Sequence, residues 1–367
     1  MDRCRQLGRY LGRCAKRGVS AALVLGCCLT ASPAHAGSAA PSVPADYLPL
    51  FVMYSGTPHP RQLQDLKEFL LSSQVPGDTV KDTLETVVFK LNTFKAGFAY
   101  PVFRDEFSTS GNACVVADSR HAELAEAWTL LTSERIYRPL QLRPVSHQEA
   151  QQLLDNVFDH ELFHCYDMVR RSLRDIGQQI ADQGPQYFAY WGEVGADAYA
   201  ALQHLRQHGG DGVMPRIREF RALNLLNGDA VHYTSPTLDY IMRHHSAQSL
   251  SGMTTRQLIA LADRIREETV LSPAKFAIIQ AIAAQMNRDY EALIADYRGL
   301  PKPYEGQLMR PAEAPVEPAY ATALFAQVRA ALRNLGGEKS VGSAYFKPLI
   351  KKFIPSDRPL LQVAAYD

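Results

Sequence analysis

The chain has 367 residues, of which 46% are hydrophobic and 21% are charged, and its formal net charge is +1. This composition excludes a disordered chain, and the length allows one large hydrophobic core or two modest ones. Without residues 1–36 the chain keeps 33 basic and 37 acidic residues, a net charge of −4. No basic patch stands out, so we expect no nucleic-acid partner.

Residues 1–36 are typical of a secretory signal peptide. Six basic residues precede the apolar run VSAALVLGCCLTA, and the stretch SPAHA, which ends at Ala36, offers a cleavage site flanked by small residues. The run is too short for a membrane span, and no later segment reaches the roughly 18 apolar residues that a span needs. We therefore expect an exported protein, periplasmic or secreted, with no transmembrane span in the mature chain. An alternative is a lipoprotein, in which Cys27 is lipidated after Gly26.

The region before residue 146 combines helices with a marked strand pattern. Residues 61–73 and 121–134 have apolar residues at three- and four-residue spacing, which predicts helices. Strand character is concentrated in residues 96–107 and 111–118, where aromatic and β-branched residues gather between turn signals. We therefore expect a helix-rich fold with a small sheet that precedes the motif described next.

Beyond the leader the chain has two cysteines, Cys114 and Cys165. In an oxidising compartment they could form a disulfide. The alternative is two buried free thiols, and the spacing of the residues does not decide between them.

The next predicted element is a helix over residues 146–177. Ser146 and Glu149 have the S-x-x-E spacing of a capping box, and the apolar pattern continues to Gly177. Apolar residues on both sides of this helix predict that it is buried at the centre of the fold.

The same helix contains the sequence HELFH. His160 and His164 are four residues apart, so they share one face of the helix and can bind one metal ion. Glu161 lies one step around the helix and can reach a water molecule on that metal. The alternative is two buried histidines that hydrogen-bond to neighbouring carbonyls.

A further helix is predicted over residues 187–210, and it carries Glu193 and Asp197 among small and aromatic residues. Carboxylates on an otherwise apolar surface need a partner. A catalytic zinc ion is one such partner, because two histidines and one glutamate leave a fourth position for water. A carboxylate on a ligand histidine would also fix the tautomer of that histidine. The alternative is a solvated helix face.

His204 and His208 repeat the four-residue spacing near the end of this helix, but Leu205 stands where HELFH has its glutamate. A cationic histidine is stabilised near a helix C-terminus. We expect both to be surface residues.

The rest of the chain is mainly helical by the same criterion. The expected helices cover residues 254–268, 272–297 and 319–337, and a stretch with five prolines at 299–318 separates the last two.

HELFH and EVGAD together resemble the paired motifs of the gluzincin, or thermolysin-like, zinc metallopeptidases. In that family HExxH is followed, on a second helix, by a glutamate ligand and by an aspartate four residues later; here 28 residues separate His164 from Glu193. The resemblance implies that one Zn²⁺ ion per chain is bound by His160, His164 and Glu193. It also implies that Glu161 is the general base and that Asp197 orients His160.

Two shorter segments extend this resemblance. GDAVHYTSP is similar to the family segment whose histidine stabilises the transition-state oxyanion, which implies that role for His232. The acidic partner of this histidine is left open between nearby Asp229 and an aspartate position held here by Asn227. Asn112 and Ala113 are similar to the asparagine-alanine edge strand that pairs with peptide substrates in the family.

The resemblance implies an α+β, helix-rich, zincin-like fold with a small N-terminal sheet and a helical C-terminal lobe. The expected function is that of an exported zinc metallopeptidase that hydrolyses peptide bonds with metal-activated water; its substrate would be a peptide or protein, including cell-wall peptides. The alternatives are a metal that only braces the helices, and a cell-envelope binding or assembly protein without a metal.

The expected organisation is a signal peptide (1–36), a lobe with the edge strand and HExxH (37–175), a helical lobe with the third ligand (176–300), a Pro-rich connector (301–318) and a C-terminal helix and tail (319–367).

Overall fold

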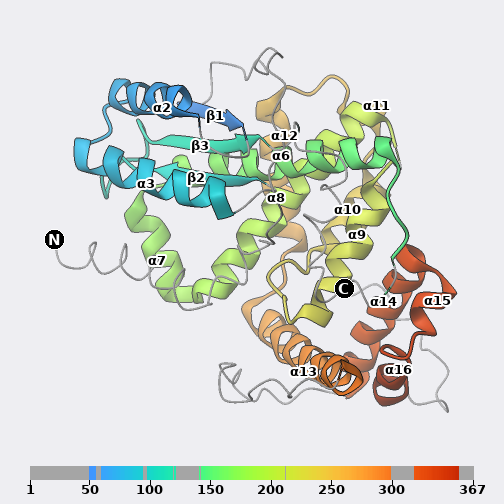
Figure 1. Ribbon diagram of the computed structural model, residues 1–367. Helices are drawn as coiled ribbons and strands as arrows, with labels where there is room; N and C mark the ends of the chain where they lie inside the picture. Colours follow the sequence, from blue (N-terminus) through green and yellow to red (C-terminus); the bar gives the residue numbers. More distant parts are fainter. Residues whose placement is uncertain are drawn as a thin grey trace.

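The computed structural model of the protein describes residues 49–54, 59–93, 97–118, 120, 140, 142–210, 212–298 and 318–354. The predicted signal peptide with Cys27, the expected helix at 121–134 and nearly all of the Pro-rich connector lie outside the described residues. The described part combines a three-stranded sheet with many helices, as expected for a helix-rich α+β fold (Figure 1).

The sheet has the order β1-β3-β2, with β1 (Leu50–Tyr54) parallel and β2 (Phe98–Val102) antiparallel to the central strand β3 (Ala113–Asp118). Every residue of β3 is buried, because both faces of the sheet are covered. Alternate side chains belong to different cores: Ala113, Val115 and Ala117 pack with α2 (Pro60–Ser72) and α3 (Gly77–Thr93), while Cys114 and Val116 pack with α6 (His147–Val169). The predicted sheet is confirmed. Strand β1 and helix α3 were not predicted.

Helix α6 begins as predicted, with a complete capping box between Ser146 and Glu149. It ends earlier than predicted. Residues 170–172 interrupt it, and α7 (Leu173–Gln183) starts anew from the N-cap Ser172, whose hydroxyl accepts a hydrogen bond from Asp175 N. The prediction of one helix to Gly177 is therefore wrong, because a serine cap reinitiates the chain in a new direction. The lobe boundary expected at residues 175/176 falls inside α7.

Helix α8 (Pro185–His208) crosses α6 and ends at Gly209, whose left-handed conformation (φ 75°) is typical of a helix stop. The remaining elements follow in chain order: α9 (Met214–Leu223), η2 (Asn224–Asn227), α10 (Ser235–His244), α11 (Ala247–Leu250), α12 (Thr255–Thr269), α13 (Pro273–Arg298), α14 (Pro318–Gly336), α15 (Glu338–Val341) and α16 (Lys347–Phe353). The helices predicted around residues 254–268, 272–297 and 319–337 are confirmed by α12, α13 and α14.

The described residues form three hydrophobic clusters. One joins the sheet to α2 and α3, a central one joins β3, α6, α8 and α12, and a third joins the start of α8 to α9, α13 and α14–α16. Helix α8 belongs to two of them, so it connects the sheet side with the C-terminal helices. Among the described residues, no helix combines the length and the apolar character that crossing a membrane requires.

Candidate metal centre

The crossing of α6 and α8 brings three potential ligands together. His160 Nε2 lies 3.2 Å from Glu193 Oε2, His164 Nε2 lies 3.4 Å from Glu193 Oε1, and the two Nε2 atoms are 3.1 Å apart. One ligand atom from each residue lies within 4.8 Å of the others. Gly192 lies against the His164 ring, where a Cβ atom would make an ordinary van der Waals contact at 3.8 Å with Cε1. The structure thus assembles the predicted ligand set from two helices.

The charges around this cluster favour a cation. His160 and Glu193 are buried, and Glu193 Oε2, which His160 Nε2 and His232 Nε2 approach to 3.2 and 3.3 Å, accepts no well-directed hydrogen bond. Burial lowers the pKa of His160, but the carboxylates of Glu193 and Asp197 outweigh burial and raise this pKa to about 10. Burial raises the pKa of Glu193, but the charges of His232 and His160 hold this pKa well below its usual range. A bound metal ion would satisfy the same lone pairs without protonating them.

Asp197 holds the outer nitrogen of His160. Its Oδ1 lies 2.8 Å from His160 Nδ1, so a neutral His160 carries its proton on Nδ1 and turns the lone pair of Nε2 toward Glu193. Asp197 in turn accepts hydrogen bonds from Arg221 Nη2, at 2.6 Å, and from the hydroxyl of Thr234. The resemblance predicted a contact between Asp197 and His160. Arg221 carries no local signal, and Thr234 lies in the segment GDAVHYTSP without a predicted role, so both of these contacts become visible only through the fold.

Glu161 lies next to the start of strand β2. A Cβ atom at Gly97, just before β2, would lie 3.6 Å from Glu161 Cγ and 3.3 Å from Val157 Cγ1. Gly97 has φ +133°, a conformation that side chains rarely adopt. Lys90 of α3 interacts electrostatically with Glu161, and burial lowers the pKa of this lysine. Glu161 therefore lies between α6 and the start of edge strand β2.

His232 approaches the ligand cluster from the other side, on the turn before α10. Its Nδ1 lies 2.6 Å from Asp229 Oδ2, its backbone N–H donates to Asp229 Oδ1 at 3.2 Å, and its Nε2 lies 3.3 Å from Glu193 Oε2. Burial lowers the pKa of His232, but Asp229 and Glu193 outweigh it and raise this pKa. The structure thus identifies Asp229, and not Asn227, as the acidic partner.

The edge-strand prediction for Asn112 and Ala113 is wrong. Ala113 begins β3, which is paired on both sides, so it offers no free edge to a peptide. Asn112 is buried, and its carboxamide donates to the carbonyls of Val169 and Arg171 at 3.0 and 3.2 Å. Its side chain anchors the sheet to the end of α6. The antiparallel edge beside Glu161 belongs to β2 instead.

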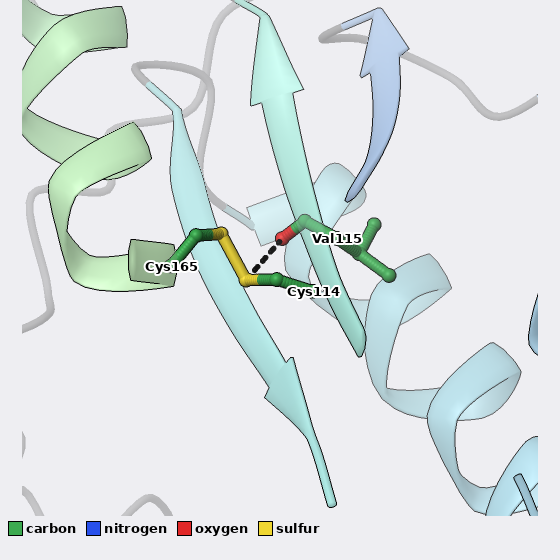
Figure 2. The surroundings of a disulfide bond; sticks show 3 residues. All are labelled: Cys114, Val115 and Cys165. Atoms are coloured by element: carbon green, nitrogen blue, oxygen red, sulfur yellow. Dashed lines mark hydrogen bonds between the residues drawn. A yellow bond between two sulfur atoms is a disulfide. The ribbon is translucent and has the colours of Figure 1, made fainter. Parts of the chain in front are cut away.

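Cys114 and Cys165 form a disulfide (Figure 2). It joins the central strand β3 to α6 at the residue that follows His164. The structure therefore selects the disulfide over two free thiols.

His204 corrects another prediction. Its side chain is buried, and neither ring nitrogen has a hydrogen-bond partner, whereas His208 lies at the exposed end of α8. Burial lowers the pKa of His204 to about 4. The His204 ring lies beside Gln152 and Gly212, so it is inside the fold. Its position near the C-terminal end of α8 had predicted an exposed side chain.

Comparison with known proteins adds no relative to this picture. No protein-family model, no curated protein and no solved structure matches the chain. The functional argument therefore depends on the geometry of the site.

Proposed function

We propose that this protein is an exported zinc metallopeptidase of the gluzincin type. The observation that carries the proposal is the convergence of His160, His164 and Glu193 from two helices, with Glu193 Oε2 buried and accepting no well-directed hydrogen bond. Two imidazoles and one carboxylate are a donor set that suits zinc and leaves a position for water.

The charges of the surrounding groups also fit a cation. Glu193, Asp197 and Asp229 bring three carboxylates to the cluster; when His160 is neutral, as a metal ligand must be, Arg221 and a protonated His232 compensate only two of their charges. Buried carboxylates need a counter-charge or coordination to be stable. A metal ion on His160, His164 and Glu193 would supply it.

Each reacting group then has a task. A zinc ion at this position would acidify bound water and polarise a scissile carbonyl. The Glu161 carboxylate accepts the proton of the attacking water and passes it to the leaving nitrogen. His232, whose Nδ1 is held by Asp229, can offer a proton on Nε2 to the developing oxyanion. Asp197 holds the proton on His160 Nδ1, so His160 Nε2 stays available as a ligand.

The disulfide supports export, because disulfides persist mainly in oxidising compartments. The substrate class that fits this chemistry is a peptide or protein, including cell-wall peptides. Among the described strands, β2 lies at an edge of the sheet beside Glu161, where an extended peptide could pair with it.

One observation favours a second candidate function. His232 Nε2 lies only 3.3 Å from Glu193 Oε2. If His232 moved onto the metal as a fourth ligand, the site would be closed and would only brace the helices. The metal content of His232→Ala decides between the two, because loss of metal would support the closed site.

The experiment that tests the proposal measures zinc and peptide hydrolysis in four proteins purified without chelator or added metal: wild type, Glu193→Ala, Glu161→Gln and the control Glu85→Gln, which changes an exposed glutamate of α3. We expect one zinc ion per chain in all except Glu193→Ala. We expect cleavage of a fluorogenic peptide library or of cell-wall stem peptides by wild type and Glu85→Gln only. Folded wild-type protein that binds no added zinc would refute the metal site, and hydrolysis by Glu161→Gln would refute the mechanism.

A further inference from the structure

The C-terminal helices α14–α16 follow the Pro-rich connector and pack beside α9 and α13 (Figure 1). Their apolar residues belong to the same hydrophobic cluster as Val231 and Tyr233, the two neighbours of His232. The members from α14 are Leu324, Phe325, Val328, Ala331, Leu332 and Leu335. The C-terminal helices therefore share a core with the turn that carries the candidate oxyanion histidine.

One hydrogen bond joins this segment to that turn directly. The hydroxyl of Tyr233 donates to Gln327 Oε1 of α14 at 2.5 Å. Tyr233 is only 2% exposed and stands between His232 and Thr234 in the chain. A displacement of Tyr233 would therefore move both neighbours, one of which contacts Glu193 and the other Asp197.

A second set of contacts joins α14 to α9. Asn334 Nδ2 of α14 donates to Glu219 Oε1 of α9 at 2.8 Å. Two residues beyond Glu219, Arg221 donates to Asp197. Helix α14 thus contacts both elements that complete the outer side of the metal centre.

The turn at residues 228–234 belongs to no helix or strand. Its local hydrogen bonds run from Asp229 N to Asn224 O, from Tyr233 N to Ala230 O and from Thr234 N to His232 O, and His232 bonds to Asp229. These bonds shape the turn locally, and the side-chain contacts of Tyr233 with α14 and of Thr234 with α8 hold it beside the metal centre. The ligands on α6 and α8, by contrast, are held by continuous helices.

We propose that the C-terminal segment, residues 318–354, is a positioning element for His232, and that Gln327 acts through Tyr233 to hold this histidine beside Glu193. The inference rests on the proposed function for its kinetic consequence. Gln327 touches no ligand, so it is a positioning residue. Because reacting groups must be placed to within about 1 Å, and such a misplacement can lower the rate about 100-fold, loosening this turn lowers turnover without removing the metal.

The test compares wild type with Gln327→Leu, Tyr233→Phe, their double variant, and Gln327→Glu, which keeps an acceptor for the tyrosine hydroxyl. Arg333→Ala is the matched control, because Arg333 lies on α14 in an exposed ion pair with Glu338 at 2.8 Å. Four quantities are measured: kcat, KM, zinc per chain, and hydrogen exchange of the Tyr233 and Thr234 amides. A thermal unfolding curve checks that each variant is folded.

We expect each single variant to lower kcat about tenfold or more, with little change in KM and one zinc ion per chain. The double variant should lose no more than the single variants, because both remove the same bond. Gln327→Glu should recover most of kcat, and exchange at Tyr233 and Thr234 should accelerate only where the bond is lost. Arg333→Ala should behave like wild type.

The inference is overturned if kcat and exchange in Gln327→Leu and Tyr233→Phe match wild type, if the two effects add, or if zinc is lost. A wild-type protein that binds zinc but cleaves no peptide would refute the proposed function alone. In that case the exchange rates still decide whether the segment holds the turn.

Discussion

The two sides of the candidate metal centre are built differently. The ligands His160, His164 and Glu193 lie on two long helices that share a core, whereas His232 lies on a turn held by contacts with α8 and α14. Helical spacing alone brings His160 and His164 onto one face. No local rule brings the turn to the same place, so this side depends on the packing of distant parts of the chain.

We expect this difference to separate effects on metal binding from effects on the rate of hydrolysis. A change on the helix side should alter how tightly the metal is held. A change on the turn side should alter the rate and leave the metal in place. The predictions below test that division, from the largest expected effect on activity to the smallest.

Replacement of His232 by alanine should lower kcat about 10²- to 10³-fold, the usual loss when one oxyanion donor is removed. Zinc should remain at one per chain, because His160, His164 and Glu193 are untouched. Steady-state kinetics and metal analysis of the same preparation check both points. Unchanged kcat would remove His232 from the site, and loss of zinc would show that the division between the two sides is wrong.

Asp197→Asn tests the residue that joins the two sides. The carboxylate contacts His160 on the helix side, and it accepts hydrogen bonds from Arg221 and Thr234 on the other. Loss of a carboxylate behind a ligand histidine typically weakens metal binding about 10- to 100-fold. Competition with a zinc chelator measures the change, and Asp239→Asn, at a half-exposed carboxylate on α10, is the control. Wild-type affinity in Asp197→Asn would show that His160 needs no such partner.

Removal of the disulfide tests how much the link between β3 and α6 stabilises the helices that carry the ligands. The double variant Cys114→Ala/Cys165→Ala opens a link across 51 residues, and the expected loss in the free energy of unfolding is about 2–4 kcal/mol. The kcat of the folded variant should stay close to wild type, because Cys165 faces the sheet while His164 faces Glu193. Denaturant unfolding and kinetics at low temperature check this expectation. A large fall in kcat with unchanged stability would contradict it.

The sequence predicted the helix side better than the turn side, for physical reasons. His160, His164, Glu193 and Asp197 lie on helices whose apolar periodicity is strong, so their relative directions follow from helical geometry. Arg221 and Thr234 lie 24 and 37 residues from Asp197; nothing in the local sequence marks Arg221, and the segment that contains Thr234 does not indicate its contact with Asp197. Strand order is equally non-local: residues 111–118 predicted a strand, but its central place depends on β1, the apolar run Leu50–Tyr54, which lies outside the region predicted to form the sheet.

Asn112→Ala tests whether Asn112 is a buried anchor of the central strand or part of a substrate-binding edge strand. A substrate-binding asparagine would raise KM when lost, whereas a buried anchor would lower stability. Because its carboxamide binds the carbonyls of Val169 and Arg171 and accepts a hydrogen bond from Arg104 N, its removal leaves buried polar groups unpaired. The expected loss in the free energy of unfolding is about 1–3 kcal/mol, with KM and kcat unchanged. Urea unfolding and peptide kinetics measure the two effects, and a raised KM at wild-type stability would return Asn112 to the substrate site.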